Sequence, residues 1–224
     1  MKAMILAAGR GERMRPLTDR RPKPLLPVLG KPLIEYHIER LRDAGYHDIV
    51  INLHHLGEQI RAHLGDGSRF GVEIRYSEEQ PQRLETGGGI FKALPLLGDG
   101  PFLVINGDIW SDCDLSPRRL DDKALAHLVL VPNPEHNRGG DLGLENGWVT
   151  NAPRSHTFSG IGWYRAALFA DCRGGAFPLA PLLREAADQQ RVSGEICKEK
   201  WMDIGTPERL DEIAKWLASA SPRR

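Results

Sequence analysis

Residues 2–18 read KAMILAAGRGERMRPLT, and this stretch decides the fold class. Residues 2–7 form a short, largely apolar run that is typical of a buried strand. A polar loop, residues 9–31, follows this run and begins with two closely spaced glycines. Because glycine lets backbone N–H groups come close to an anion, a glycine loop directly after a strand favours a phosphate-binding site in an α/β protein.

Short apolar runs and amphipathic segments alternate along the rest of the chain. In residues 32–45, for example, Ile34, Ile38 and Leu41 recur at helical spacing. Further strands are expected at 48–52, 72–77, 102–106, 125–131, 158–164 and 201–204, and further helices at 57–64, 88–97, 178–190 and 207–219. Strands separated by helices predict parallel β-α-β units in one sheet.

The interval 132–160 interrupts this alternation and contains Asn146-Gly147, a hairpin signal. It predicts a small β-rich lobe over the sheet. In open α/β sheets, ligands bind at the carboxyl ends of the strands. The segments that follow predicted strands and can therefore carry a site are 8–23, 77–89, 106–112 and 203–206.

Composition excludes several function classes. Thirty Lys and Arg balance thirty Asp and Glu, for a net charge of zero, which argues against a nucleic-acid binder or a polybasic membrane module. No apolar run approaches the roughly 20 residues of a membrane span. We therefore expect a cytoplasmic protein with no nucleic-acid partner and no membrane partner, and the sequence leaves the oligomeric state open.

The cysteines and histidines lack the spacing of metal sites. Three cysteines, Cys113, Cys172 and Cys197, lie far apart without a C-x-x-C pair, which predicts separate thiols in a reducing compartment rather than a disulfide framework or a zinc site. The eight histidines include His54-His55 but show no ligand pattern, so we expect them to be structural.

The loop after the first strand is strongly basic. Between Arg10 and Lys23, six basic residues stand against two acidic ones in a chain that is neutral overall. A flexible loop with this charge suits a polyphosphate, because each charge-assisted hydrogen bond contributes about 1.5–3 kcal/mol. A solvated basic loop is the alternative. The position after the first strand, and the placement of Lys23 between Pro22 and Pro24, favour phosphate binding.

Two common phosphate motifs do not fit this loop. The dinucleotide pattern G-x-G-x-x-G needs a third glycine where Met14 stands, which disfavours a dinucleotide-dependent oxidoreductase. The Walker pattern needs Ser or Thr after a glycine-lysine pair, but Gly30-Lys31 is followed by Pro32.

A longer signature is spread over the chain. It consists of Leu6-Ala7-Ala8-Gly9-x-Gly11-x-Arg13, Arg15-Pro16-Leu17-Thr18, Pro22-Lys23-Pro24-Leu25-Leu26-Pro27, Asn106-Gly107-Asp108, Ser159-Gly160-Ile161-Gly162 and Trp201-x-Asp203-Ile204-Gly205-Thr206-Pro207. With these motifs the chain resembles the sugar-1-phosphate nucleotidyltransferases. The resemblance implies a Rossmann-like nucleotidyltransferase fold of the α/β class, with a mostly parallel central sheet, helices on both faces and a small β-rich sugar-binding lobe.

The resemblance also implies a division of the chain. We expect a single nucleotidyltransferase domain over 1–224. Its nucleotide-binding part covers about 1–110, its sugar-binding part about 111–206, and a closing helix 207–219. Residues 219–224 are expected to form a frayed end.

The implied reaction is the attack of a sugar-1-phosphate oxygen on the α-phosphorus of a nucleoside triphosphate, with pyrophosphate leaving. Asp108 and Asp203 would hold Mg²⁺, which prefers a few carboxylates together with phosphate oxygens and water. Arg13 would hold the leaving pyrophosphate, and Lys23 would stabilise charge at the α-phosphate. These four residues are the expected catalytic set.

The resemblance places the nucleotide and the sugar as well. Gln80 would read the imide edge of uracil or thymine, with the backbone near Glu85 and Gly87 completing the base pocket. Asn151 stands where many relatives carry Glu-Lys-Pro, so glucose-type recognition is in doubt. Other expected nucleotide contacts are Ala8, Gly9, Gly11, Glu12, Arg13, Lys23 and Asn106, and the expected sugar contacts are Asn106, Asp141, Asn151 and Gly160. If the sugar carries a lactyl carboxylate, Arg138, Arg154 or Lys198 would face it.

The segment Glu85–Gly89 resembles the small, single-domain uridylyltransferase branch of the family. The implied substrates are UTP and a sugar 1-phosphate, above all N-acetylmuramic acid α-1-phosphate, in bacterial cell-wall recycling. The alternatives are a mannose-1-phosphate guanylyltransferase and a glucose-1-phosphate uridylyl- or thymidylyltransferase. A non-catalytic sensor of sugar nucleotides is an alternative of a different class.

Overall fold

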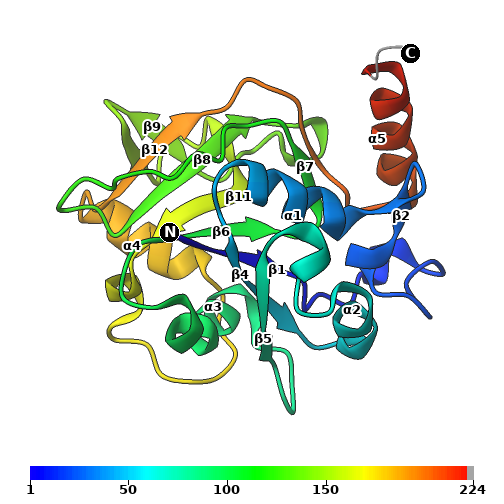
Figure 1. The fold of residues 1–224 in the computed structure, drawn as a ribbon. Helices are drawn as coiled ribbons and strands as arrows, with labels where there is room; N and C mark the ends of the chain where they lie inside the picture. Colours follow the sequence, from blue (N-terminus) through cyan, green and yellow to red (C-terminus); the bar gives the residue numbers. More distant parts are fainter. Residues whose placement is uncertain (221–224) are drawn as a thin grey trace.

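A computed structural model describes residues 1–220 of the chain, and a large sheet runs through it. The strands of this sheet are β1 (Lys2–Leu6), β4 (Asp48–Leu53), β5 (Glu73–Glu78), β6 (Phe102–Asn106), β8 (Ala126–Pro132), β9 (Gly143–Glu145), β10 (Trp148–Thr150), β11 (His156–Tyr164) and β12 (Val192–Ile196). The nine strands lie in the order β5-β4-β1-β6-β11-β8-β12-β10-β9 (Figure 1).

The sheet is mostly parallel, as predicted. Strands β5, β4, β1 and β6 pair in parallel. Strand β11 runs antiparallel to both β6 and β8, and β12 returns parallel to β8. The predicted hairpin at Asn146-Gly147 is confirmed: it joins β9 to β10, and both of its residues have positive φ. Only β11 and β10 therefore run against the other strands of this sheet.

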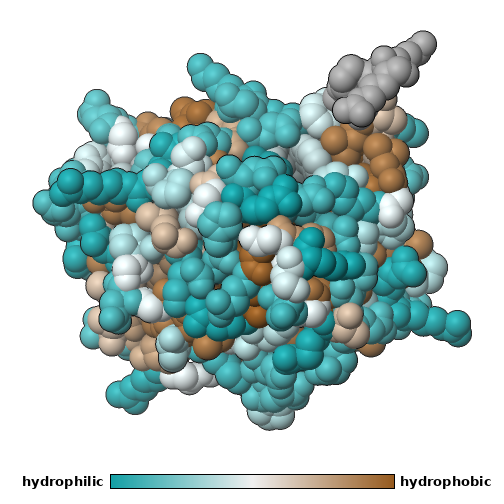
Figure 2. Space-filling view, in the orientation of Figure 1, coloured by the Kyte–Doolittle hydropathy of each residue, from teal (hydrophilic) through white to brown (hydrophobic). Residues whose placement is uncertain are grey.

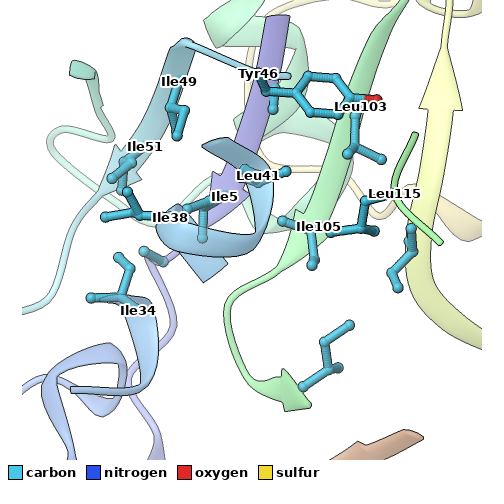
Figure 3. Close-up of a cluster of buried hydrophobic side chains, with 14 of the residues drawn as sticks. Ile5, Ile34, Ile38, Leu41, Tyr46, Ile49, Ile51, Leu103, Ile105 and Leu115 are labelled. Carbon is cyan, nitrogen blue, oxygen red and sulfur yellow. The ribbon is translucent and has the colours of Figure 1, made fainter. Parts of the chain in front are cut away.

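Helices cover both faces of the sheet. Neighbouring residues of each strand point to opposite faces, so an apolar strand offers side chains for packing on both. Ile5 packs in one hydrophobic cluster with Ile34 and Ile38 of the first helix (Figure 3). Met4, one residue earlier, packs in a second cluster with Ile90. The helices that contribute to the first cluster are α1 (Leu33–Asp43) and α2 (Gly57–Leu64), and those of the second are α3 (Glu85–Leu97) and α4 (Ala180–Asp188).

A two-stranded ribbon beside the sheet supports the end of the chain. It pairs β7 (Ile109–Ser111) with β13 (Trp201–Asp203) in antiparallel register. Helix α5 (Pro207–Ala220) packs on this ribbon and on a small pair of strands, β2 (Pro27–Val28) and β3 (Lys31–Pro32). Figure 2 shows apolar residues gathered at the upper right, where Figure 1 places α5. Of the predicted frayed end, 219–224, residues 221–224 lie outside the described residues, and Ser219 still belongs to α5.

No helix in the described residues 1–220 is long and apolar enough to cross a membrane.

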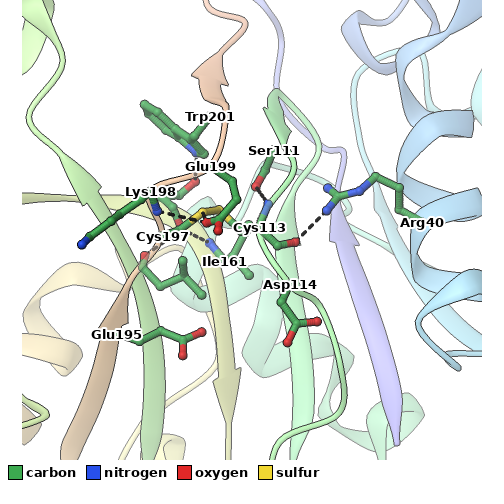
Figure 4. Close-up of a disulfide and its surroundings, with 12 residues drawn as sticks. Arg40, Ser111, Cys113, Asp114, Ile161, Glu195, Cys197, Lys198, Glu199 and Trp201 are labelled. Atoms are coloured by element: carbon green, nitrogen blue, oxygen red, sulfur yellow. Dashed lines mark hydrogen bonds between the residues drawn. A yellow bond between two sulfur atoms is a disulfide. The ribbon is translucent and has the colours of Figure 1, made fainter. Parts of the chain in front are cut away.

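The prediction of separate thiols was wrong for two of the three cysteines. Cys113 and Cys197 form a disulfide, with their Cα atoms 5.8 Å apart (Figure 4). Cys113 follows β7 and Cys197 follows β12, so the fold joins two positions that are 84 residues apart in the sequence. Sequence spacing gives no sign of this proximity. Cys172 has a free thiol and is half-buried.

Candidate active site

A cleft of about 820 Å³ opens at the carboxyl ends of β1, β4, β5 and β6. This is the edge at which open α/β sheets bind their ligands. Its lining comes from the loop after β1 (6–13), from Lys23 and Pro24, from Asn52 and His54 after β4, from residues 79–86 after β5 except Gln80 and Leu84, from Asn106–Asp108 after β6, and from Gly205. The predicted nucleotide contacts Ala8, Gly9, Gly11 and Glu12 are all among these residues.

Lys23 and Asp108 meet in this cleft. The Lys23 Nζ atom lies 2.8 Å from Asp108 Oδ2, and the lysine side chain is only 8% exposed. Lys23 begins a short 3-10 helix, Lys23–Leu25, between two prolines whose fixed backbone angles hold it in place. Because a buried ammonium is costly without an anionic partner, this lysine is built to face a carboxylate or a phosphate.

Asp203 lies next to Asp108 although it comes from the far end of the chain. It pairs with Ile109 across the β7–β13 ribbon, and the N–H of Ile204 donates to the carbonyl of Asp108 at 2.7 Å. Arg209 of α5 donates to Asp203 Oδ2. Asp203 Oδ1 is buried and has no hydrogen-bond donor among the described residues, although His136 Nε2 is 2.9 Å away. The ribbon thus brings both predicted carboxylates to one edge.

Arg13 completes the basic side of the cleft. Its loop turns at Gly11, where φ is +64° and a Cβ atom would lie 2.9 Å from the Thr18 side chain. The guanidinium flanks Gly205, because a Cβ on this glycine would lie 3.2 Å from both terminal nitrogens of Arg13 and 3.0 Å from Asp203 Oδ2. Arg13 and Asp203 therefore face the same glycine: Arg13, Lys23, Asp108 and Gly205 line the cleft, and Asp203 lies beside Gly205 just outside the lining.

A buried polar network closes the opposite end of the cleft. Glu79 is 0% exposed. Its two carboxyl oxygens accept from Asn52 Nδ2 at 2.6 Å and from the N–H of Leu84 at 2.7 Å. Asn52 Oδ1 in turn accepts from the N–H of Ala7 at 2.7 Å. This network was not predicted from the sequence, although polar residues at the ends of apolar strands indicate such a network.

His37 lies beneath the turn that carries Asp108. The ring belongs to α1 and is 2% exposed. Burial, together with the nearby charge of Arg40, lowers the pKa of His37 from 6.5 to about 4, although the charge of Asp108 and contacts to the backbone of Gly107 and Ile109 act to raise it. A neutral imidazole therefore supports the turn.

The predicted base contacts separate into two groups. Glu85 lines the cleft with a positive φ of 59°, a backbone conformation that non-glycine residues adopt rarely and often at functional sites. Gly87 is buried against Phe177, whose ring would lie 2.6 Å from an added Cβ, and it does not line the cleft. Gln80 is exposed and lies outside the lining, while Gln82 and Arg83 belong to it.

The predicted sugar contacts also divide. Asn106 lines the cleft, and Gly160 packs directly behind it in an irregular part of β11, where an added Cβ would lie 2.6 Å from Asn106 Nδ2. Asp141 accepts hydrogen bonds from Asn137 Nδ2 at 3.1 Å and from the N–H of Phe158 at 3.0 Å, so it ties the segment after β8 to β11.

Asn151 has a structural contact instead of a place in the cleft. It donates to the carbonyl of Arg184 at 2.9 Å and to Asp188 Oδ1 at 2.8 Å, both in α4. The three cations considered for a lactyl carboxylate, Arg138, Arg154 and Lys198, are exposed and outside the lining.

Known proteins match the chain closely. A family model described as nucleotidyl transferase matches residues 2–138. The N-acetylmuramate alpha-1-phosphate uridylyltransferase of Neisseria meningitidis serogroup B is 52% identical over 230 residues, covering 98% of this chain and 99% of that protein. The protein of the same name from Caulobacter vibrioides is 36% identical over 239 residues, covering 97% of each.

The fold matches as well. A crystal structure of a Bacillus anthracis protein, named as a glucose-1-phosphate thymidylyltransferase, superimposes with a TM-score of 0.85 over 100% of this chain and 97% of that chain. At 24% identity this match shows the fold alone. With a family model over more than half of its length and two relatives matched almost end to end, the chain belongs to the nucleotidyl transferase family, as its motifs predicted.

Proposed function

We propose that the protein transfers a uridylyl group from UTP to N-acetylmuramic acid α-1-phosphate, giving the UDP-sugar and pyrophosphate. The observation that carries this proposal is that Arg13, Lys23 and Asp108 line one cleft, with Asp203 beside the lining residue Gly205. The sugar is inferred from the two relatives of that name, which match 97–98% of this chain. Relatives that use glucose or mannose 1-phosphate, by contrast, match 51–60% of it.

In the proposed reaction an oxygen of the sugar phosphate attacks the α-phosphorus of UTP. A new P–O bond forms, the bond from the α-phosphorus to the bridging oxygen breaks, and that oxygen leaves with pyrophosphate. The enzyme must align two anions that repel each other, so positioning and charge neutralisation supply most of the rate. Lys23 would neutralise charge at the α-phosphate, and Arg13 would hold the departing pyrophosphate.

The residues present fit a divalent cation. Asp203 Oδ1 is a buried carboxylate oxygen that accepts no hydrogen bond among the described residues, with His136 Nε2 2.9 Å away, and the 43% exposed Asp108 carboxylate directly precedes Ile109, the residue that pairs with Asp203. Two carboxylates, with phosphate oxygens and water, are a donor set that Mg²⁺ accepts. Asp108 and Asp203 would hold it, and a bound Mg²⁺ would supply charge stabilisation for the phosphates.

The nucleotide and the sugar are assigned to different parts of the sheet. Residues 1–110 supply β5, β4, β1 and β6, and we assign this part to UTP, with the base toward Glu85. Residues 111–206 supply the β-rich part, which we assign to the sugar, and Asn106 lies at the junction. UTP and sugar phosphates are cytoplasmic metabolites, so the proposed place of action is the cytoplasm.

The test is a matrix of four nucleoside triphosphates against the 1-phosphates of N-acetylmuramic acid, N-acetylglucosamine, glucose and mannose, with pyrophosphate release as the readout. We expect the highest kcat/KM for UTP with N-acetylmuramic acid α-1-phosphate. A higher kcat/KM for another pair would overturn the substrate assignment. Binding of UTP without pyrophosphate release in any pair would instead indicate a sensor.

A further inference from the structure

His54 has a fixed orientation at the edge of the cleft. Its Nδ1 atom lies 2.8 Å from the backbone carbonyl oxygen of Glu79. A carbonyl oxygen only accepts hydrogen bonds, so Nδ1 carries the proton. In the neutral ring this leaves Nε2 as a hydrogen-bond acceptor, and His54 is a lining residue of the cleft.

The support of this ring is rigid. Glu79 is 0% exposed and is held through both of its carboxyl oxygens by Asn52 and by the N–H of Leu84. Its own N–H donates to the carbonyl of Leu53 at 2.8 Å. Asn52 also accepts from the N–H of Ala7. The ends of β1, β4 and β5 therefore hold in place the Glu79 carbonyl oxygen, to which His54 donates. The ring nitrogen therefore has a defined place at the edge of the cleft.

The position of His54 suits contact with the nucleobase of a bound nucleotide. Asp108 follows β6, whereas His54 follows β4, with β1 between these two strands. Strands lie about 4.8 Å apart, so His54 lies about 10 Å to the side of the phosphate end. We expect the nucleoside of a nucleotide whose α-phosphate is held by Lys23 to extend in this direction. The lining residue Glu85 lies at this same end, while Gln80 is not a lining residue.

We propose that His54 determines the preference for a uracil base, by accepting a hydrogen bond from N3–H through Nε2. Cytosine carries a lone pair at N3, which would face the lone pair of Nε2 and leave both unsatisfied. This inference rests on the proposed use of UTP, and it assigns to a histidine the part first expected of Gln80.

Two substitutions distinguish the contributions of the two ring nitrogens of His54 to nucleotide binding. His54→Asn keeps a donor close to the place of Nδ1 and removes Nε2, whereas His54→Gln places an amide close to Nε2. His55→Asn is the matched control, because the neighbouring histidine does not line the cleft, and Gln80→Ala tests the first candidate. The measurement is calorimetric binding of UTP and of CTP to each full-length variant without sugar phosphate, with thermal unfolding as the check on folding.

For the parent we expect UTP to bind more tightly than CTP. The ratio should fall about tenfold in His54→Asn, stay mostly intact in His54→Gln, and stay unchanged in His55→Asn and Gln80→Ala. An unchanged ratio in His54→Asn, an equal loss in both His54 variants, or a loss in Gln80→Ala would overturn the assignment.

A measurement on the unaltered protein avoids the question of folding. The triphosphate of 3-methyluridine has no N3–H, so we expect it to bind at least about tenfold more weakly than UTP. Equal binding would contradict the role of His54. Neither measurement needs a sugar phosphate, so a failure of the proposed transfer reaction and a failure of the His54 assignment give different results.

Discussion

Lys23 Nζ lies 2.8 Å from Asp108 Oδ2, although 85 residues separate the two positions in the chain. The lysine is buried and the aspartate is partly open to the cleft. When no phosphate or metal is bound, each group neutralises the other. We therefore expect the negatively charged phosphates of the substrate to bind at this ion pair, between the Lys23 ammonium and a metal ion held by Asp108.

Replacing Lys23 should affect chemistry more than folding. Lys23→Met removes the ammonium but leaves Asp108 partly solvated, so we expect kcat to fall by about 10²-fold or more while the KM for UTP changes less. Steady-state kinetics with pyrophosphate detection checks this. Arg20→Met is the control, because this exposed arginine of the same loop does not line the cleft. Equal kinetics in the two variants would remove Lys23 from the mechanism.

Asp108→Asn tests the carboxylate of the same pair. The amide keeps the shape but loses the charge, so kcat should fall by at least about 10²-fold, with unfolding close to that of the parent. Added Mg²⁺ should not restore the rate. Asp99→Asn, at an exposed position outside the cleft, should behave like the parent. Near-normal turnover of Asp108→Asn in saturating Mg²⁺ would contradict the metal assignment.

Gly160 offers a test of the support behind Asn106. Gly160 and Gly147 both have φ near +80°, at +82° and +81°, but an added Cβ meets Asn106 only at Gly160. Alanine at either position should cost about 1–2 kcal/mol of unfolding free energy from backbone strain. Gly160→Ala should in addition lower kcat/KM about tenfold or more, because displacement of Asn106 disturbs the alignment of the substrates. Equal kcat/KM in the two variants would show that Asn106 is not positioned by Gly160.

The fold follows from the sequence wherever a strand is a continuous apolar run. Residues 102–106, for example, became β6 with the predicted bounds. Strand β12 was missed because its sequence, VSGEI, has neither a continuous apolar run nor a clean alternation. The reversed direction of β11 was also outside the prediction, because periodicity reports which residues are buried and not how a strand is paired.

The site follows from the sequence where a motif fixes the backbone. The glycine loop and the ribbon bring Arg13 and Asp203 to the same residue, Gly205, at the cleft. Gln80 does not line the cleft, because the turn after β5 decides which side chain of that segment points inward, and Gln82 and Arg83 do so instead. Contacts such as that of Asn151 with α4 depend on helix packing, which no local pattern records.

The disulfide should contribute to stability under oxidising conditions. It closes a separation of 84 residues, and removing such a bond costs about 2–4 kcal/mol of unfolding free energy. We expect the double variant Cys113→Ser, Cys197→Ser to show this loss in denaturant unfolding without reductant, and Cys172→Ser to show none. With dithiothreitol the parent should approach the double variant. A parent whose stability does not respond to reductant would show that the two thiols are not bonded.

His37 should make the fold sensitive to mild acid. Its native pKa is lowered from 6.5 to about 4, so between these values the unfolded chain binds a proton that the native state does not. Stability is therefore lost as the pH falls below about 6.5, by about 2 kcal/mol between about pH 7 and about pH 5. Denaturant unfolding at both pH values should show this difference in unfolding free energy in the parent, and the difference should be absent in His37→Gln. The same pH dependence in both proteins would assign the acid sensitivity to other groups.

In the proposed reaction, Arg13, Lys23 and the two aspartates hold UTP at the cleft so that a sugar phosphate displaces its pyrophosphate. The most direct measurement follows UTP labelled at the α-phosphorus, mixed with N-acetylmuramic acid α-1-phosphate and Mg²⁺. We predict that the label moves into the UDP-sugar, with one pyrophosphate released for each transfer, and that Asp203→Asn abolishes the transfer. Label that stays in UTP, or that appears as UMP without a UDP-sugar, would contradict the claim.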